Sequence, residues 1–541
     1  MSITRVGGRS PNGRPAEAAG GEEHIGIPGL GRHALFYQDS HRLPTVSHGK
    51  GIYIYDTDGK RYLDACSGAI SANLGHANER VMAAARRQMG RISFTYRTQF
   101  ENEPANELAE LLAQLSPREV NRVFFVNSGS EAVESAIKLA RQYWWATGRR
   151  GKSEIFSRRP SYHGATLGAL ASTGFAPLIT PFRAMLKPSL KISAPFCYHC
   201  PLGKRYPECG IDCAHELERE IQSVGAENIA AFLVEPIGGA TTGAAVPPDE
   251  WFPIVERICN EYEILLIVDE VMTGCGRTGT FFGFEHWDIT PDIVATSKGL
   301  SGGYTPIGAV LASSTIVDAV LQSGGFMHGH TYAGNPLSAA ITLEVIRIIL
   351  DEKLVENSRV VGTYLHQRLH ELAERYPVIG DIRGRGLFSG IEFVRDRVNR
   401  EPFPASWFVA FEATEIARKH GLLLYPRRSI NGLSGDHVLI APPLIIDEAG
   451  VDEIMVLFDR TLADLTAMVD KYLAEEARSA AIEPIERYQQ SETVPAYARG
   501  DLSKIGPEED ANVTAAMRND YASGDGEEFD PATEEEAGDD A

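Results

Sequence analysis

The chain has 541 residues, a net charge of −21, and ordinary shares of hydrophobic (43%) and aromatic (9%) residues. Its length allows more than one hydrophobic core, its acidity argues against nucleic acid as a partner, and no apolar run is long enough to predict a membrane span. The N-terminus lacks an apolar segment of the signal-peptide type, so we expect a cytoplasmic protein that does not bind membranes.

Both ends of the chain have compositions that do not support a core. Residues 1–33 are polar and contain Gly, Pro and Arg, which predicts a disordered extension. Residues 481–541 form an acidic tail, in which residues 501–541 hold fourteen acids and two bases and therefore carry −12 of the net charge. We expect the tail to be solvated, and a role in binding a partner is the alternative.

The fold begins with residues 34–69. Residues 51–55 alternate as a strand does, residues 56–59 suit a turn, and residues 61–64 suit a returning strand. We expect this hairpin to form the N-terminal part of a small domain.

A strand over residues 122–126 leads through the turn Asn127–Ser130 into a helix over residues 131–141. A helix N-terminus after a Gly/Ser turn presents free backbone N–H groups and the positive end of the helix dipole, so it suits an anion such as phosphate. Gly129 lets the backbone approach a ligand, and Ser130 adds a hydroxyl. A plain helix cap is the alternative.

Polar side chains follow two further strands. Tyr162 and His163 come after a short strand over residues 153–156, where Tyr162 could stack on a planar ring and His163 could steer it. Simple packing is the alternative for such aromatic residues. Glu235 ends a buried strand that begins at residue 229.

Four of the seven cysteines lie in residues 196–214, which we call the cysteine-rich segment. The spacings C-x2-C and C-x3-C resemble those of metal ligands, and His199 is a further possible ligand. A structural zinc site is one interpretation, and reduced small side chains are the other. No catalytic metal is expected. The four residues are Cys197, Cys200, Cys209 and Cys213.

Two apolar runs each lead to a charged side chain, one acidic and one basic, and the two charges could serve one site. The run over residues 264–268 leads to Asp269 and Glu270, and the run over residues 293–295 leads to Lys298. A lysine amine can form a Schiff base with the aldehyde of pyridoxal phosphate, and a carboxylate can keep its ring nitrogen protonated. Taken alone, Lys298 would be a solvated loop residue and Asp269 a metal-binding or helix-capping acid.

The overall pattern predicts an α/β fold with two domains. Residues 70–345 alternate short apolar strands with helices, which is typical of a mostly parallel sheet with helices on both faces. Residues 346–480 show a different pattern of helices and strands. This pattern predicts a smaller α+β domain, completed by residues 34–69.

These motifs together resemble the class III pyridoxal-phosphate-dependent aminotransferases of fold type I, over about residues 35–470. The matching positions are Ser128–Ala132, Tyr162 with His163, Glu235 with Pro236, Asp269–Val271, Gly276–Gly279, Ser297–Gly299, and Thr331 with Gly334, Asn335 and Pro336.

The resemblance implies roles for the central residues. Lys298 would hold the cofactor as a Schiff base and move the proton between substrate and cofactor carbons. Asp269 would pair with the ring nitrogen, and Val271 and Tyr162 would enclose the ring. His163 would adjoin the ring.

It also implies how the phosphate is held. Gly129 and Ser130 would bind it, and Thr331 would reach the phosphate of a neighbouring subunit, so a homodimer with shared active sites is implied. Glu235 and Glu270 would orient the site.

One departure concerns the substrate carboxylate. In members that act on 4-aminobutyrate, a Glu after the Glu-Pro pair gates a carboxylate-binding Arg, whereas Ala240 lies near that place here. We therefore do not expect an acid-gated switch. Arg427 and Arg428 are candidates for binding a carboxylate, and a surface role is the alternative.

The implied activity is the transfer of an amino group from a primary amine or amino acid to a small 2-oxo acid such as pyruvate or 2-oxoglutarate. A lyase, decarboxylase or aminomutase on the same fold is the alternative enzyme, and a scaffold without activity is the alternative outside catalysis.

Overall fold

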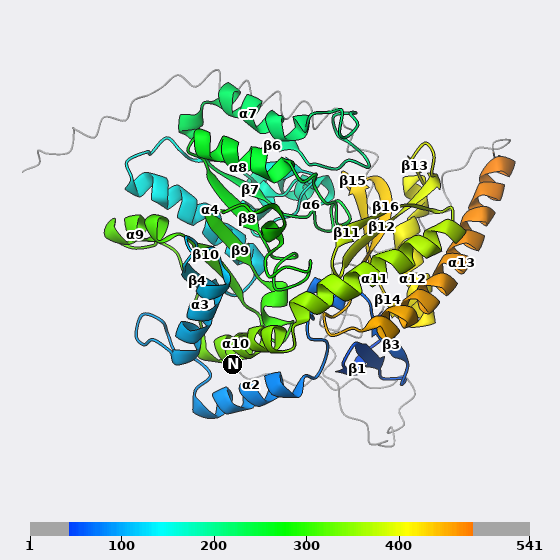
Figure 1. The fold of residues 1–541 in the computed structure, drawn as a ribbon, viewed down its shortest axis with the longest axis horizontal. Helices are drawn as coiled ribbons and strands as arrows, with labels where there is room; N and C mark the ends of the chain where they lie inside the picture. Colours follow the sequence, from blue (N-terminus) through cyan, green and yellow to red (C-terminus); the bar gives the residue numbers. More distant parts are fainter. Residues whose placement is uncertain (1–42, 480–541) are drawn as a thin grey trace, which may run out of the picture.

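The computed structural model describes residues 43–479, which form a large part and a smaller part that lie side by side (Figure 1). The predicted extension, residues 1–33, and the predicted tail, residues 481–541, lie outside the described residues. Among residues 43–479, no helix combines the length and the apolar character needed to cross a bilayer.

The large part is built on a seven-stranded sheet with the order β4-β10-β9-β8-β7-β5-β6. The strands from β9 to β6 run parallel, and β10 is antiparallel to both of its neighbours. The predicted α/β fold with a mostly parallel sheet is confirmed. The strands are β4 (Arg122–Val126), β5 (Glu154–Arg159), β6 (Leu190–Ser193), β7 (Ile229–Val234), β8 (Leu265–Asp269), β9 (Ile293–Thr296) and β10 (Gly308–Ala312).

Helices cover both faces of this sheet (Figure 1). Successive strand residues enter two different cores: Leu233 belongs to a core shared with α4 and α9, whereas Phe232 belongs to a core shared with α7, α8 and α10. Burial on both faces explains why these strands are continuous apolar runs rather than alternating ones. The helices are α2 (Glu79–Arg91), α3 (Glu103–Leu115), α4 (Gly129–Ala146), α7 (Asp212–Val224), α8 (Trp251–Glu261), α9 (Ser314–Gln322) and α10 (Pro336–Asp351).

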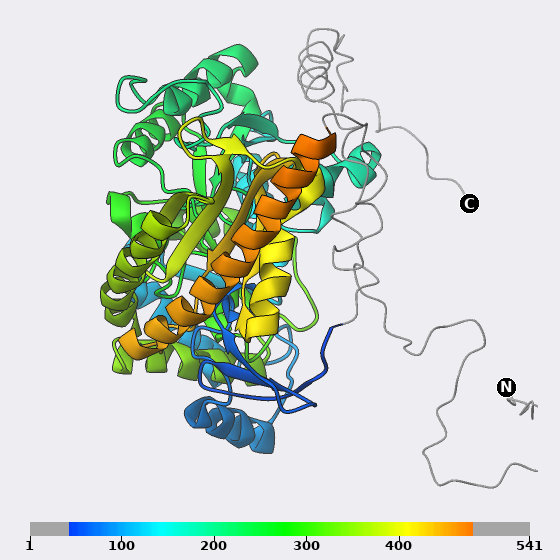
Figure 2. The same ribbon diagram turned by 90° about the vertical axis from the view of Figure 1, so that its right-hand side faces the viewer.

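The smaller part combines segments from the two ends of the described chain. Its main sheet has the order β11-β12-β16-β15, and α11, α12 and α13 pack beside it (Figure 2). The predicted N-terminal hairpin is present as β2 and β3, and β3 pairs in parallel with β14. The elements are β1 (Val46–Lys50), β2 (Tyr53–Asp56), β3 (Arg61–Asp64), α11 (Leu354–Arg375), β11 (Ile379–Arg385), β12 (Phe388–Asp396), α12 (Val409–His420), β14 (Leu422–Leu423), β15 (Tyr425–Ile430), β16 (Ser434–Ile440) and α13 (Glu448–Ser479).

Candidate active site

A cavity of about 140 Å³ lies where several strands of the large sheet end. Asp269 is the last residue of β8, Lys298 follows β9, and Glu235 follows β7. Parallel strands end at the same edge of a sheet, which is where open α/β sheets place their ligands. The cavity is lined by Ser128, Gly129, Ser130, Tyr162, His163, Gly164, Glu235, Ile237, Asp269, Val271, Met272, Thr273 and Lys298.

Lys298 is a partly buried amine in this cavity. Its burial lowers the pKa of the amine to about 8, and the Arg427 charge acts in the same direction. The carboxylates of Asp269 and Glu235 oppose this shift, so both lie within electrostatic range of the amine. The result is a lysine that changes its charge close to neutral pH.

Asp269 is held by two hydrogen bonds at the base of the cavity. His163 donates from Nδ1 to its Oδ2 at 2.8 Å, and the backbone N–H of Val271 donates to its Oδ1 at 3.1 Å. The side chains of His163 and Asp269 are 0% and 5% exposed. The other ring nitrogen of His163, Nε2, is buried without a hydrogen-bond partner.

The turn before α4 closes one side of the cavity. The hydroxyl of Ser128 accepts from the N–H of Glu131 at 3.2 Å, so this serine is the helix cap. A Cβ on Gly129 would lie 2.8 Å from Cγ1 of Val271, and a Cβ on Gly164 would lie 2.7 Å from the hydroxyl of Ser130. The two glycines therefore allow a close approach that other residues would block.

Glu235 is a buried carboxylate beside a buried arginine. The N–H of Gly239 donates to its Oε1 at 2.9 Å, and Nη2 of Arg158 lies 3.6 Å from its Oε2. Burial raises the pKa of Glu235, while the charges of His163 and Arg158 lower it. Arg158 lies on β5 and is part of no motif, so nothing in the sequence marks it as a residue of the site.

Glu270 points away from the cavity, although it is adjacent to Asp269. Its carboxylate accepts from the hydroxyl of Thr273 at 2.6 Å and from the N–H of Phe284 at 2.8 Å. Burial raises the pKa of Glu270 to about 7. These contacts hold the loop after β8, so Glu270 supports the site from outside the cavity.

The two arginines of β15 lie in different environments. Arg428 is buried, with its Nε 3.5 Å from Oδ1 of Asp436 and its guanidinium over the ring of Phe408. Arg427 is partly buried and donates to the hydroxyl of Tyr425 at 2.9 Å. Arg427 also influences the pKa of both Lys298 and Tyr162. Of this pair, Arg427 is therefore the one within electrostatic range of residues that line the cavity.

Thr331 is an exposed residue of the loop before α10 and does not line the cavity of its own chain. The two positions expected to enclose a ring, Tyr162 and Val271, do line it.

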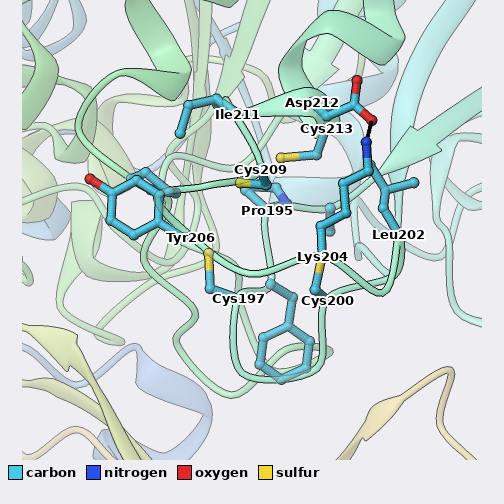
Figure 3. A pocket seen from close by; sticks show the side chains of 13 residues that line it. Pro195, Cys197, Cys200, Leu202, Lys204, Tyr206, Cys209, Ile211, Asp212 and Cys213 are labelled. Carbon is cyan, nitrogen blue, oxygen red and sulfur yellow. Dashed lines mark hydrogen bonds and ion pairs between the residues drawn. The ribbon is translucent and has the colours of Figure 1, made fainter.

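The four cysteines of the cysteine-rich segment surround a second, smaller cavity of about 20 Å³ (Figure 3). All four are free thiols. Within residues 43–479, no three His, Cys, Asp or Glu side chains are arranged to hold a metal ion. His199 instead directs its Nε2 to Glu392 in the smaller part, at 2.5 Å. The structural zinc site stays a prediction.

The donor set of the larger cavity fits pyridoxal phosphate. It offers an amine whose pKa is near 8, a buried carboxylate, and a backbone turn at a helix N-terminus. The unpartnered Nε2 of His163 and the close packing at Gly129 are further signs of a site built around a polar, planar group.

Comparison with known proteins agrees with this geometry. The family described as aminotransferase class-III matches residues 36–462. An uncharacterized aminotransferase of Bacillus subtilis, YodT, is 42% identical over 78% of this chain and 96% of its own length. The putrescine–pyruvate aminotransferase of Pseudomonas aeruginosa is 36% identical over 78% of this chain and 91% of its own.

Solved structures give the same answer. An (S)-enantioselective omega-transaminase from Thermomicrobium roseum is 37% identical, with a TM-score of 0.74 over 78% of this chain and 93% of its own. An omega-transaminase from Pseudomonas jessenii in complex with PMP is 36% identical, with a TM-score of 0.75 over 79% of this chain and 94% of its own. The lyase, decarboxylase and aminomutase alternatives are not favoured. The chain belongs to the class III aminotransferases, which have fold type I and use pyridoxal phosphate to transfer amino groups to oxo acids.

Proposed function

We propose that this enzyme takes an amino group from a primary amine or amino acid and passes it to a small 2-oxo acid such as pyruvate or 2-oxoglutarate. The observation that carries this proposal is one cavity lined by Lys298 and Asp269, with the cation of Arg427 within electrostatic range. The Pseudomonas aeruginosa relative is named a putrescine–pyruvate aminotransferase, and this name supports a small 2-oxo acid as the acceptor.

Bound pyridoxal phosphate would supply an aldehyde that condenses with amines and a ring that withdraws electrons from the substrate α-carbon. Lys298 would bind the aldehyde through Nζ and, with a pKa of about 8, would give up and take back a proton near neutral pH. Asp269 would keep the ring nitrogen protonated, since His163 and Val271 hold its carboxylate in place.

The remaining lining residues would orient the cofactor. Gly129 and Ser130 would hold its phosphate at the N-terminus of α4, where the helix dipole favours an anion. Tyr162 and Val271 would enclose the ring. Glu235 would orient the site from beside Arg158.

We propose that the enzyme works as a homodimer in which Thr331 reaches the phosphate site of the partner. The support is an exposed apolar surface around this loop, where the rings of Phe94 and Tyr332 lie 5.5 Å apart and Met327 is 69% exposed. Large exposed apolar patches mark interfaces. Sedimentation of the full chain is the direct measurement, and a monomer with full activity would refute the shared site.

We also propose a cytoplasmic location. All seven cysteines of the chain lie within the described residues, and all are free thiols. Reduced cysteines are typical of proteins that work in a reducing compartment.

The proposed binding of the acceptor's carboxylate by Arg427 can be tested with Arg427→Ala. We expect KM for pyruvate to rise about 30-fold, because a charge-assisted hydrogen bond to the acid is lost. KM for a simple aldehyde acceptor, which has no carboxylate, should not change. The matched control is Arg395→Ala. Arg395 lies on β12 of the same sheet as Arg427 and pairs with Glu476 of α13. An equal effect on both acceptors would refute the role of Arg427.

The type of reaction can be tested by its stoichiometry. With an amine donor and pyruvate, we expect one alanine to form for each pyruvate consumed, with no free ammonia. Release of ammonia in the absence of an oxo acid would instead support a lyase.

The rate of cofactor binding should depend on pH through Lys298. Only the neutral amine attacks an aldehyde, and the pKa of Lys298 is lowered from 10.5 to about 8. After the cofactor is removed, the rate at which added pyridoxal phosphate restores the near-visible absorbance should rise through pH 8 and level off by about pH 9. A rate that keeps rising to pH 10 would show an ordinary lysine.

A further inference from the structure

Four side chains form one row across the main sheet of the smaller part. The register places Asp381 on β11 opposite Glu392 on β12, Glu392 opposite His437 on β16, and His437 opposite Arg427 on β15. Residues that are directly opposite in a sheet project from the same face. Neighbouring strands are about 4.8 Å apart, so Glu392 lies about 10 Å from Arg427 along this row.

The row faces the large part of the enzyme and contacts it. The carboxylate of Glu392 is fully buried, and its Oε1 lies 2.5 Å from Nε2 of His199. Nε2 of His437 lies 2.9 Å from the backbone carbonyl of Ala240, in the loop after Glu235. The row is therefore held at two points by loops of the large part.

Glu392 also reaches across β16 to the strand that carries Arg427. The hydroxyl of Ser429 donates to Oε2 of Glu392 at 3.1 Å, and Arg383 donates to the same oxygen at 2.6 Å. Ser429 is two residues from Arg427 on β15, so both project from the same face of the strand. One carboxylate thus connects His199 to the strand of Arg427.

The segment that carries His199 is also held by two contacts just before this residue. The guanidinium of Arg383 lies 4.8 Å from the centroid of the Phe196 ring, and Arg400 donates to the backbone carbonyl of Tyr198 at 2.8 Å. The remainder of the cysteine-rich segment continues into α7 of the large part. The segment is therefore a bridge between the two parts of the enzyme.

We propose that His199 is a positioning residue: through Glu392 it sets the place of β15, and thereby the distance of Arg427 from the cavity residues Lys298 and Tyr162. The cysteine-rich segment is then a determinant of affinity for the substrate carboxylate. This inference rests on the proposed role of Arg427 in carboxylate binding.

The test compares acceptors with and without a carboxylate in the holoenzyme. His199→Ala is expected to raise KM for pyruvate about tenfold, because a small displacement of a binding group is enough for such an effect. KM and kcat with a simple aldehyde should stay the same. His199→Gln should restore most of the affinity, since its side-chain amide can donate to Glu392.

Two further variants make the result specific. Lys204→Ala breaks an exposed ion pair with Asp212 (2.7 Å) in the same segment, and it should change neither KM. Glu392→Gln keeps the shape of the side chain but weakens its contact with His199, and it should raise KM for pyruvate in the same direction. This variant provides the answer if His199→Ala does not fold.

A double variant separates the positioning role of His199 from the carboxylate-binding role of Arg427. In an Arg427→Ala background, His199→Ala should have no further effect on KM for pyruvate, because the positioned group is absent. Additive effects, or an equal rise of KM for the aldehyde, would refute the positioning role alone. If Arg427→Ala itself does not distinguish the two acceptors, the proposed carboxylate site is wrong instead.

Discussion

Lys298→Ala is expected to lower kcat by at least about 10⁴-fold, because it removes both the amine that would bind the cofactor aldehyde and the group that would move the proton. The purified variant should also lack the near-visible absorbance that a covalent link between cofactor and lysine produces. Steady-state turnover of an amine with pyruvate measures the first effect, and an absorption spectrum measures the second.

The matched control is Lys187→Ala, which removes an exposed lysine that pairs with Glu154 of β5. It should keep both turnover and absorbance. A Lys298→Ala enzyme that retains the absorbance and more than about one hundredth of its activity would exclude Lys298 as the reactive amine.

Asp269→Asn is expected to reduce kcat about 10³-fold while leaving the fold intact. Asparagine has the same shape and can keep the hydrogen bond from the N–H of Val271. It carries no negative charge, so it cannot keep a ring nitrogen protonated. Single-turnover kinetics with an excess of enzyme would locate the loss in the proton-transfer step rather than in substrate binding.

Asp292→Asn is the control for this variant. Asp292 is a partly buried carboxylate directly before β9, at the other end of the strands, where it accepts from the N–H of Leu266 at 2.8 Å. Burial raises the pKa of Asp292 to about 6. The substitution should retain normal kcat, and a similar loss in both variants would show that the effect of Asp269 is only structural.

Much of the large sheet and its site was predictable from local patterns. Apolar runs such as the one before Asp269 identify buried strands, and the rule that ligands bind at the carboxyl ends of parallel strands brings Asp269 and Lys298 together. The turn at Gly129 is recognisable because a glycine and two serines precede a clear helix. These patterns involve residues close together in the sequence, so they can be recognised without knowledge of the fold.

The opposite orientation of Glu270 was also predictable, since neighbouring residues at the end of a strand project to opposite sides. The burial of Arg158 and Arg428 and the contact made by His199 were not. Arginine is mostly exposed, so nothing local marks Arg158 and Arg428 as buried. The contact of His199 with Glu392 joins residues 193 positions apart, and only the packing of the two parts creates it.

The parallel pairing of β3 with β14 also has a consequence for biosynthesis. Leu63 must find Leu422 as its neighbour, and the chain between them contains the whole large sheet. A ribosome adds about 5–20 residues per second, so the first strands emerge roughly twenty seconds to a minute before the strand that completes their edge. During that interval the nascent chain exposes an open strand edge, which is a template for aggregation and a natural target for chaperones.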